Sequence, residues 1–284
     1  MRSLWLANGI NMILDPLLIF GVGPFPELGV EGAAIATNIG RGIGVIFQLY
    51  ILFRGSSLIR IKWENLQVRF KVILRLINIS LGGIGQYIIG TASWLFMVRI
   101  VSIFGSEALA GYTIAVRIIM FSILPSWGMA NAAATLVGQN LGAQKVDRAE
   151  KAVWKCSRYN LYFLGLISII IVSQADKLIM LFNTDATVVH NGMMALRYVC
   201  SGYIFFAYGM VISQAFNGAG DTRTPTIINL FIYWMFQLPF AYFLGVFTSF
   251  ESEGVFMAIV LTEILLTAVY FWFFKKGRWK TINI

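Results

Sequence analysis

Three polar residues interrupt the first apolar stretch of the sequence at helical spacing. Asn8, Asn11 and Asp15 lie three and four residues apart, so one face of a helix carries two amides and a carboxylate. Pro16 follows directly, and because proline has no N–H, the carbonyl of Met12 loses its helical donor. A carboxylate in an apolar segment is typical of an ion or proton site. These oxygens suit Na⁺, and the same carboxyl group could instead carry a proton; structural pairing with an arginine is the alternative.

The composition indicates that these residues belong to a membrane protein. Of the 284 residues, 58% are hydrophobic and 12% are charged, against about 25% charged in a soluble domain. Cys156 and Cys200 are too few for a disulfide framework. The sequence has no GxxxxGK[ST] phosphate loop, and its single histidine leaves no metal cluster. We therefore expect neither an enzyme nor an ATP-driven motor, and no metal beyond Na⁺ at Asp15.

Eight apolar segments of helical length account for most of the chain. A membrane-spanning helix needs about 20 residues, and none of the segments alternates as barrel strands do. We therefore predict an all-α polytopic membrane protein of eight transmembrane helices, with helix kinks at Pro16 and Pro125. The predicted spans are residues 3–20, 32–53, 72–104, 108–138, 159–175, 189–216, 225–247 and 254–274.

The basic residues are concentrated in alternate loops. Sixteen of the 22 lysines and arginines lie at residue 2, in 54–71 and 145–158, at residue 223 and in 275–280. The positive-inside rule then predicts a multi-pass protein of the cell membrane with both termini in the cytoplasm. This gives the net charge of +9 a topological origin, and we expect no nucleic-acid partner. Residues 144–158 are expected to form an interfacial helix, with a solvated linker helix as the alternative.

Residues 31–55 and 253–277 resemble each other at a constant offset. The matches are Glu31-Gly32 with Glu253-Gly254, Ala36 with Ala258, Gly55 with Gly277, and Arg41 opposite Glu263. The second copy follows four predicted helices and the first follows none, so we expect two helices of one half and all six of the other. The expected domains are 1–55, a cytoplasmic linker 56–71, and 72–284. A complete eight-helix protein with one duplicated hairpin is the alternative.

Several motifs resemble the multidrug and toxic compound extrusion (MATE) family. They are NGINMILDPLLIFG at 8–21 with PELGVEGAAIAT at 26–37, ATLVGQNLGA at 134–143, and FNGAGDTRTP at 216–225. The resemblance implies a fold of twelve helices in two six-helix lobes, of which this chain has the last two helices of the N-lobe and the whole C-lobe. It also implies a cation- or proton-coupled antiporter that exports bulky amphipathic, often cationic, drugs and toxic compounds.

The resemblance also implies roles for particular residues. It places Asp15, Asn11 and Thr37 at the cation- or proton-binding site of the N-lobe, to which we add Asn8. Gln86 and Phe206 fall where some relatives carry the two acids of a C-lobe site, so we expect them on a substrate path instead. The coupling ion, Na⁺ or H⁺, is the only expected cofactor. The expected partners are small amphipathic substrates and the lipid bilayer, and the expected state is a monomer.

Two other functions remain open at this point. Arginines lie within the predicted spans, namely Arg41, Arg99, Arg117 and Arg197. They could line a basic lumen, which would favour a flippase of a lipid-linked anionic precursor in the same superfamily; snorkelling toward the helix ends is the simpler interpretation. The second alternative is an inactive truncated fragment.

Overall fold

The computed structural model describes residues 2–54, 62 and 67–281. It divides into two units, Met1–Phe70 and Lys71–Ile284. The described residues form helices and turns and include no strand, which confirms the all-α prediction. Gly55 and most of the predicted linker 56–71 lie outside the described residues.

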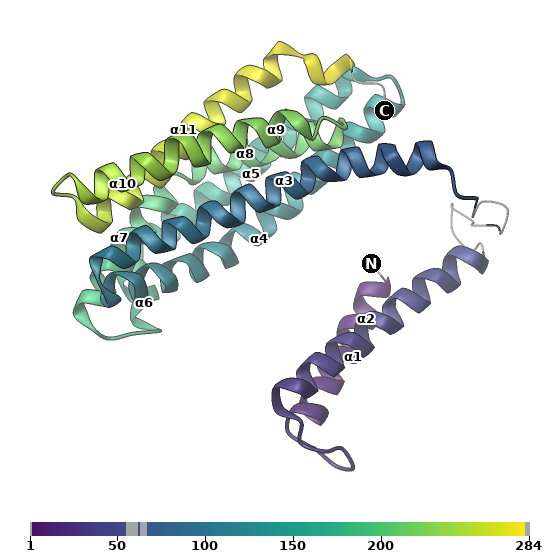
Figure 1. Ribbon diagram of the computed structural model, residues 1–284, viewed down its shortest axis with the longest axis horizontal. Helices are drawn as coiled ribbons and strands as arrows, with labels where there is room; N and C mark the ends of the chain where they lie inside the picture. The colour runs from purple at the N-terminus through teal and green to yellow at the C-terminus, as the bar shows by residue number, and fades with distance from the viewer. Residues whose placement is uncertain (1, 55–61, 63–66, 282–284) are drawn as a thin grey trace. The chain divides into compact units, whose positions relative to one another are not determined.

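The first unit is a hairpin of α1 (Arg2–Ile19) and α2 (Gly29–Arg54) (Figure 1). Small residues recur at every fourth position of α2, and Gly32, Ala36, Gly40 and Gly44 are all buried. A stripe of this kind lets two helix backbones approach closely. α2 is long and apolar enough to cross a membrane, whereas α1, with its polar residues, is not among the helices that meet this criterion.

The second unit is a bundle of long helices (Figure 1). Its elements are α3 (Phe70–Val101), η2 (Ser102–Phe104), α4 (Ser106–Gly142), α5 (Val146–Ser173), α6 (Ala175–Met180), α7 (Ala186–Ser201), α8 (Tyr203–Gly218), α9 (Arg223–Asn229), η3 (Leu230–Gln237), α10 (Leu238–Val246), α11 (Glu251–Lys276) and η4 (Arg278–Thr281). α4 packs against α5, α7 and α8, and α11 packs against α7, α8 and α10. In the described part of the chain, six helices could cross a membrane, or seven if α7 and α8 count as one span.

Two predicted elements differ from the structure. The predicted span 189–216 is not one straight helix, because α7 and α8 meet at Gly202 with a bend of 56°. Residues 144–158 do not form a separate interfacial helix, since α5 runs without a break from Val146 to Ser173. Ala149, Val153 and Ser157 recur on the buried face of α5 at intervals of four, so this charged segment packs into the bundle.

Two hydrophobic clusters fill the two ends of the second unit. The first cluster draws on the end of α3, the start of α4, the end of α5 and the start of α11, and includes Tyr112, Leu164 and Phe256. The second draws on the later part of α4, the start of α5 and the end of α11, and includes Val137 and Phe274. The long helices α4, α5 and α11 therefore contribute to both clusters at different heights.

A layer of buried polar residues separates these clusters. We call it the central polar layer, and its members are Ser126, Ser157, Asn160, Gln237, Thr262 and Glu263. On α5 and α11, these residues fall between the positions that enter the first and the second cluster. Polar groups at mid-depth of a membrane bundle are costly unless they are paired or functional. The central polar layer is therefore the candidate functional region of the second unit.

Glycines lock the two hairpins that the sequence repeat relates. A Cβ on Gly32 would lie 2.6 Å from the carbonyl carbon of Leu18, and a Cβ on Gly254 would lie 2.6 Å from the carbonyl oxygen of Leu244. In both hairpins the second helix thus begins with a glycine pressed against the backbone near the end of the first. The matched pair of glycines therefore has the same structural role in both hairpins.

A similar close approach makes Gly218 a sensitive position. A Cβ there would lie 2.6 Å from the Cα of Ala134 on α4, and backbone atoms cannot move aside cheaply. We expect Gly218→Ala to lower the free energy of unfolding by about 1–3 kcal/mol through overpacking. Thermal unfolding of the purified protein in detergent measures this loss.

Gly165→Ala is the matched control, because Gly165 lies within α5 and nothing approaches its Cβ position within 4 Å. This substitution should leave stability unchanged or raise it by up to about 1 kcal/mol, as alanine favours helices. Equal melting temperatures for the two variants would contradict the predicted clash at Gly218.

Candidate functional site

The structure brings Asn11, Asp15 and Thr37 together in the α1–α2 hairpin, and we call these three residues the Asp15 cluster. Asn11 Nδ2 donates hydrogen bonds to Asp15 Oδ1 at 3.3 Å and to Thr37 Oγ1 at 3.4 Å. The Thr37 hydroxyl donates to Ala33 O at 2.9 Å. All three side chains of the cluster are half-buried. The spacing on α1 indicates the first two members, and Thr37 joins them across the hairpin.

The small-residue stripe of α2 positions this cluster. A Cβ on Gly40 would lie 2.8 Å from Ala7 O and 3.3 Å from the Cβ of Asn11, so α1 lies directly against the α2 backbone at this height. Ala36, next to Thr37 in the sequence, is fully buried. The close approach of the two backbones is what brings a hydroxyl of α2 within reach of an amide of α1.

Pro16 leaves a backbone carbonyl of α1 without its helical hydrogen-bond donor, three residues before Asp15 in the sequence. It lies inside α1, and because it lacks an N–H, the Met12 carbonyl receives no helical hydrogen bond from it. Pro125 lies inside α4 in the same way, and neither proline interrupts its helix. A carboxylate, an amide oxygen, a hydroxyl and a carbonyl are the oxygen ligands that hard cations take. A carboxyl group in this position is equally suited to hold a proton.

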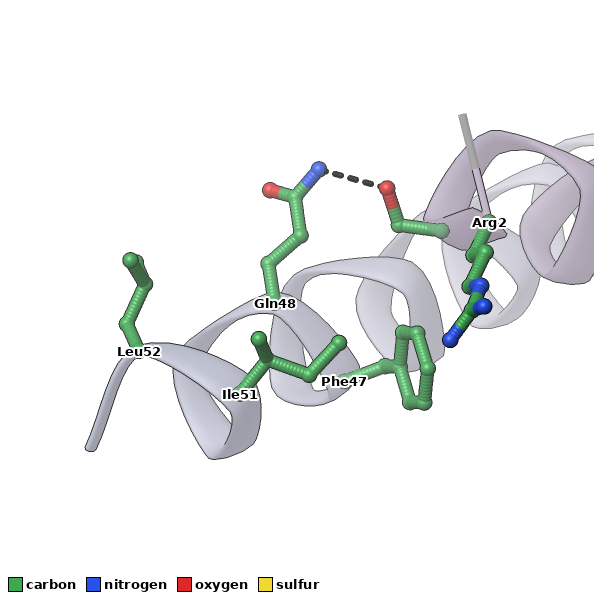
Figure 2. Close-up of a pocket in the computed structure, with 6 residues that line it drawn as sticks. Arg2, Phe47, Gln48, Ile51 and Leu52 are labelled. Atoms are coloured by element: carbon green, nitrogen blue, oxygen red, sulfur yellow. Dashed lines mark hydrogen bonds between the residues drawn. The ribbon is translucent and has the colours of Figure 1, made fainter. Parts of the chain in front are cut away.

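Asn8 does not join the Asp15 cluster through a hydrogen bond. Its side chain is exposed and forms no hydrogen bond with the described residues. A shallow depression lies at the other end of the hairpin, lined by Arg2, Ser3, Phe47, Gln48, Ile51 and Leu52 (Figure 2). Gln48 Nε2 donates to Ser3 Oγ there at 2.8 Å. This depression is separate from the Asp15 cluster and holds no acidic side chain.

Gln86 has a specific structural role in the second unit. Its Nε2 donates to Asn217 Oδ1 and to Thr222 O, both at 3.1 Å, and Asn217 Nδ2 donates back to Gln86 Oε1 at 3.3 Å. Gln86 thus ties α3 to the turn after α8. Phe206 packs against the first hydrophobic cluster and lies edge-on to Tyr203 at 6.0 Å. A substrate path past these residues stays a prediction.

A buried carboxylate lies in the central polar layer. Glu263 on α11 is 5% exposed, and its Oε1 accepts a hydrogen bond from the Tyr233 hydroxyl of η3 at 3.1 Å. The Tyr270 hydroxyl, two turns along α11, donates to Asn229 Oδ1 at 2.6 Å and accepts from Ser213 Oγ at 3.3 Å. The sequence marks Glu263 as an acid in an apolar run but contains no signal for Tyr233, which lies 30 residues away.

The arginines within the predicted spans do not neutralise these acids. Each is exposed on the surface of its own unit and forms no ion pair within the described residues; they are Arg41, Arg99, Arg117 and Arg197. The described residues also contain no group of three histidines, cysteines or acids that could hold a metal ion. Among the residues that the structure describes, Asp15 and Glu263 therefore have no basic partner.

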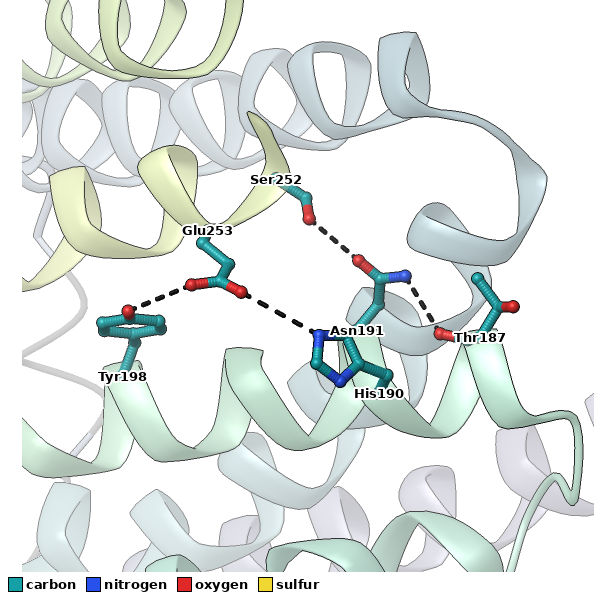
Figure 3. Close-up of polar contacts among 6 residues, drawn as sticks. All are labelled: Thr187, His190, Asn191, Tyr198, Ser252 and Glu253. Atoms are coloured by element: carbon teal, nitrogen blue, oxygen red, sulfur yellow. Dashed lines mark hydrogen bonds and ion pairs between the residues drawn. The ribbon is translucent and has the colours of Figure 1, made fainter. Parts of the chain in front are cut away.

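A second acid on α11 has a different environment (Figure 3). Glu253 Oε2 accepts from the Tyr198 hydroxyl at 3.1 Å, and Glu253 Oε1 lies 3.9 Å from His190 Nε2. Next to it, Ser252 Oγ donates to Asn191 Oδ1 at 2.8 Å. These contacts join α7 to the start of α11, and the side chain of Glu253 is 32% exposed. This carboxylate has both solvent and a histidine nearby.

Comparison with protein families matches one family to the second unit. The family is MatE, and the match covers residues 84–243, which is more than half of the chain. A probable multidrug resistance protein NorM of Thermotoga maritima is 27% identical over 97% of this chain and 59% of its own length. A protein of Shewanella oneidensis described as an FAD transporter is 26% identical over 92% of this chain and 57% of its own length. The chain thus spans less than two thirds of these relatives.

Solved structures show the same fold. An outward-facing multidrug resistance MATE family transporter of the MOP superfamily superimposes with a TM-score of 0.90 at 23% identity, over 100% of this chain and 62% of that chain. A MOP superfamily transporter from Pyrococcus furiosus, whose structure is described as having a binding pocket of reverse polarity, gives 0.86 at 25% identity over 97% and 61% of the two chains.

Proposed function

Because this chain belongs to the MatE family of membrane transporters, we propose that it works as an ion-coupled antiporter that exports bulky amphipathic, often cationic, compounds. The observation that carries the proposal is the Asp15 cluster, a half-buried carboxylate joined to an amide and a hydroxyl across two helices. Binding of Na⁺ or a proton at Asp15 would change its charge within an apolar hairpin. That change would couple outward movement of the substrate to inward movement of the ion, whose electrochemical gradient supplies the free energy.

The proposed location of the protein in the cell rests on its hydropathy and on the distribution of its charged residues. The described helices that can cross a membrane make it a multi-pass membrane protein. We propose the plasma membrane as its location, with both termini in the cytoplasm, because the basic residues gather in alternate loops. We further propose that the protein is a monomer in the lipid bilayer and that its substrates are small amphipathic compounds. It needs no cofactor beyond the coupling ion and catalyses no reaction. T. maritima NorM supports the substrate class by its description as a probable multidrug resistance protein.

Efflux from cells tests this function. Cells that lack their own efflux pumps are loaded with a fluorescent amphipathic cation, and its export is followed with and without the protein. We expect faster export that stops when a protonophore collapses the proton gradient or when Na⁺ is withdrawn, and which treatment works identifies the ion. Export no faster than in cells without the protein would overturn the proposal for this chain and favour an inactive fragment.

Transport of an anionic compound is the second candidate, as in a flippase of a lipid-linked precursor. It is favoured by the exposed arginines of the spans, which form no ion pair within the described part of the chain, and by the S. oneidensis relative, which is described as an FAD transporter. Under this function, replacement of Arg99 or Arg117 by glutamine would abolish transport while Asp15→Asn would not. The opposite pattern supports the antiporter.

A further inference from the structure

We propose that Glu263 is a proton-binding site in the second unit. Its carboxyl group takes up and releases a proton beside the Tyr233 hydroxyl. This site is separate from the Asp15 cluster and lies in the other unit. It deepens the proposed function, and rests on it only in so far as the proton is used for transport.

Glu263 lies at mid-depth of its helix. It is the thirteenth of the 26 residues of α11, about 18 Å from the helix start at 1.5 Å per residue. The apolar part of a bilayer is about 30 Å thick, so this carboxyl group lies near its centre. It also lies in the central polar layer, between the two hydrophobic clusters of the unit.

The partners of Glu263 are too few to stabilise a buried negative charge. The Tyr233 hydroxyl at 3.1 Å is its one polar contact, and Glu263 forms no ion pair within the described residues. The titratable groups that face it are Tyr233 from η3 and Tyr270 from α11 itself; α7, α8, α9, α10 and η4 direct none at it in the described part of the chain. An unpaired charge at this depth costs several kcal/mol, and a proton removes that cost.

A proton fits this site better than a metal ion. Hard cations take several oxygen ligands, whereas Glu263 has a single hydroxyl beside it. A proton needs one oxygen. Tyr233 lies in a π-helical segment, Leu230–Gln237, and such segments are frequent at functional sites.

Other residues of the central polar layer contain buried polar atoms that form no hydrogen bond with the described residues. Ser157 Oγ and Asn160 Oδ1 on α5 are buried and find no partner within the described residues, while Asn160 Nδ2 donates to Ala207 O at 3.0 Å. These are the groups that water molecules delivering a proton would use. They are a second, independent sign that this layer is not simply packed core.

Glu253 is a natural control on the same helix. It too accepts a tyrosine hydroxyl at 3.1 Å, from Tyr198. It differs from Glu263 in being 32% exposed and in having His190 3.9 Å away. If burial without a cation is what makes Glu263 bind a proton, then the two acids will behave differently in the same molecule.

Infrared spectroscopy of the purified full chain in lipid tests the proposal. We expect a carbonyl stretching band of a protonated carboxyl group that remains near neutral pH, where exposed carboxyl groups are already ionised, and that disappears during titration to alkaline pH. This band should be lost in Glu263→Gln and retained in Glu253→Gln and in Asp15→Asn. In Tyr233→Phe it should move to higher frequency because the carbonyl loses its hydrogen bond, whereas Tyr198→Phe leaves it in place.

Three outcomes would overturn the proposal: no such band, a band that persists in Glu263→Gln, or a band that does not respond to pH. Tyr233→Phe keeps the acid and so keeps the test informative if Glu263→Gln does not fold, and an unshifted band in that variant also counts against the site. The efflux assay is independent of this measurement. A chain that shows the titrating band but no efflux would refute the antiporter and leave the proton site standing.

Discussion

Asp15→Asn is expected to reduce ion-driven efflux to the level of cells without the protein. Asparagine has nearly the shape of aspartate and can still accept the hydrogen bond from Asn11, so the hairpin should remain folded. It cannot carry the charge that binds Na⁺ or the proton that the carboxyl group exchanges. The variant thus removes the coupling ion and leaves the packing of α1 against α2 intact. The rate of export of a fluorescent amphipathic cation measures the loss.

Two matched variants sharpen this experiment. Asp147→Asn removes a charge from an exposed position on α5 and should leave efflux unchanged. Thr37→Val removes one oxygen of the Asp15 cluster and should slow efflux partially, while Thr113→Val removes a similar hydroxyl, bonded to the carbonyl four residues earlier, without effect. Full efflux by Asp15→Asn would place ion coupling elsewhere in the molecule.

Trp279→Ala is expected to cause the largest loss of stability, about 3–5 kcal/mol in the free energy of unfolding. Trp279 is completely buried and is the largest of the fully buried side chains. Its ring stacks on Phe274 with centroids 4.7 Å apart, and its Nε1 donates to Phe274 O at 3.0 Å. The truncation would leave a cavity in the second hydrophobic cluster and remove one of the two hydrogen bonds that the Phe274 carbonyl accepts, the other coming from Gly277 N.

The reason for this burial is a turn at the end of α11. Gly277 has φ 75°, a left-handed conformation that suits glycine, and it returns the chain onto the bundle. Lys280 Nζ then contacts Glu150 Oε2 on α5 at 2.5 Å. Trp272→Ala is the control, since that ring is on α11 but is 55% exposed. Thermal unfolding in detergent should show a large decrease for Trp279→Ala and a small one for Trp272→Ala; equal decreases would contradict the anchoring role.

The sequence was sufficient for the helical architecture because hydropathy reports it directly. Apolar runs of about 20 residues leave little choice but a spanning helix, and the described helices follow those runs. The sequence did not predict the bend between α7 and α8. Apolar residues continue through Gly202 without a break, and a single glycine in such a run does not indicate a bend of 56°. The prediction of a separate interfacial helix at 144–158 was wrong, because α5 is one helix from Val146 to Ser173. Charged residues on the exposed face of its first part obscured the small buried residues between them.

The candidate sites, too, could be predicted from the sequence only in part. Asn11 and Asp15 could be predicted to act together because they are four residues apart on one helix. Thr37 entered through the family resemblance, and the structure brings it within 3.4 Å of Asn11. The pairing of Glu263 with Tyr233 depends on how η3 and α11 pack, which no local pattern encodes. Gln86 was expected to face substrate, and its reciprocal bonds to Asn217 could not be read from residue type.

The glycine locks of the two hairpins have a consequence for biosynthesis. The atoms nearest to the Cβ position of Gly32 belong to the helix that precedes it in the chain, and the same is true of Gly254. Each hairpin therefore contains its own closing contact and needs nothing made later by the ribosome. As soon as its two helices have entered the bilayer, α1 and α2 can pair while the remaining helices are still being translated. The hairpin of α10 and α11 can close in the same way once both of its helices have been made.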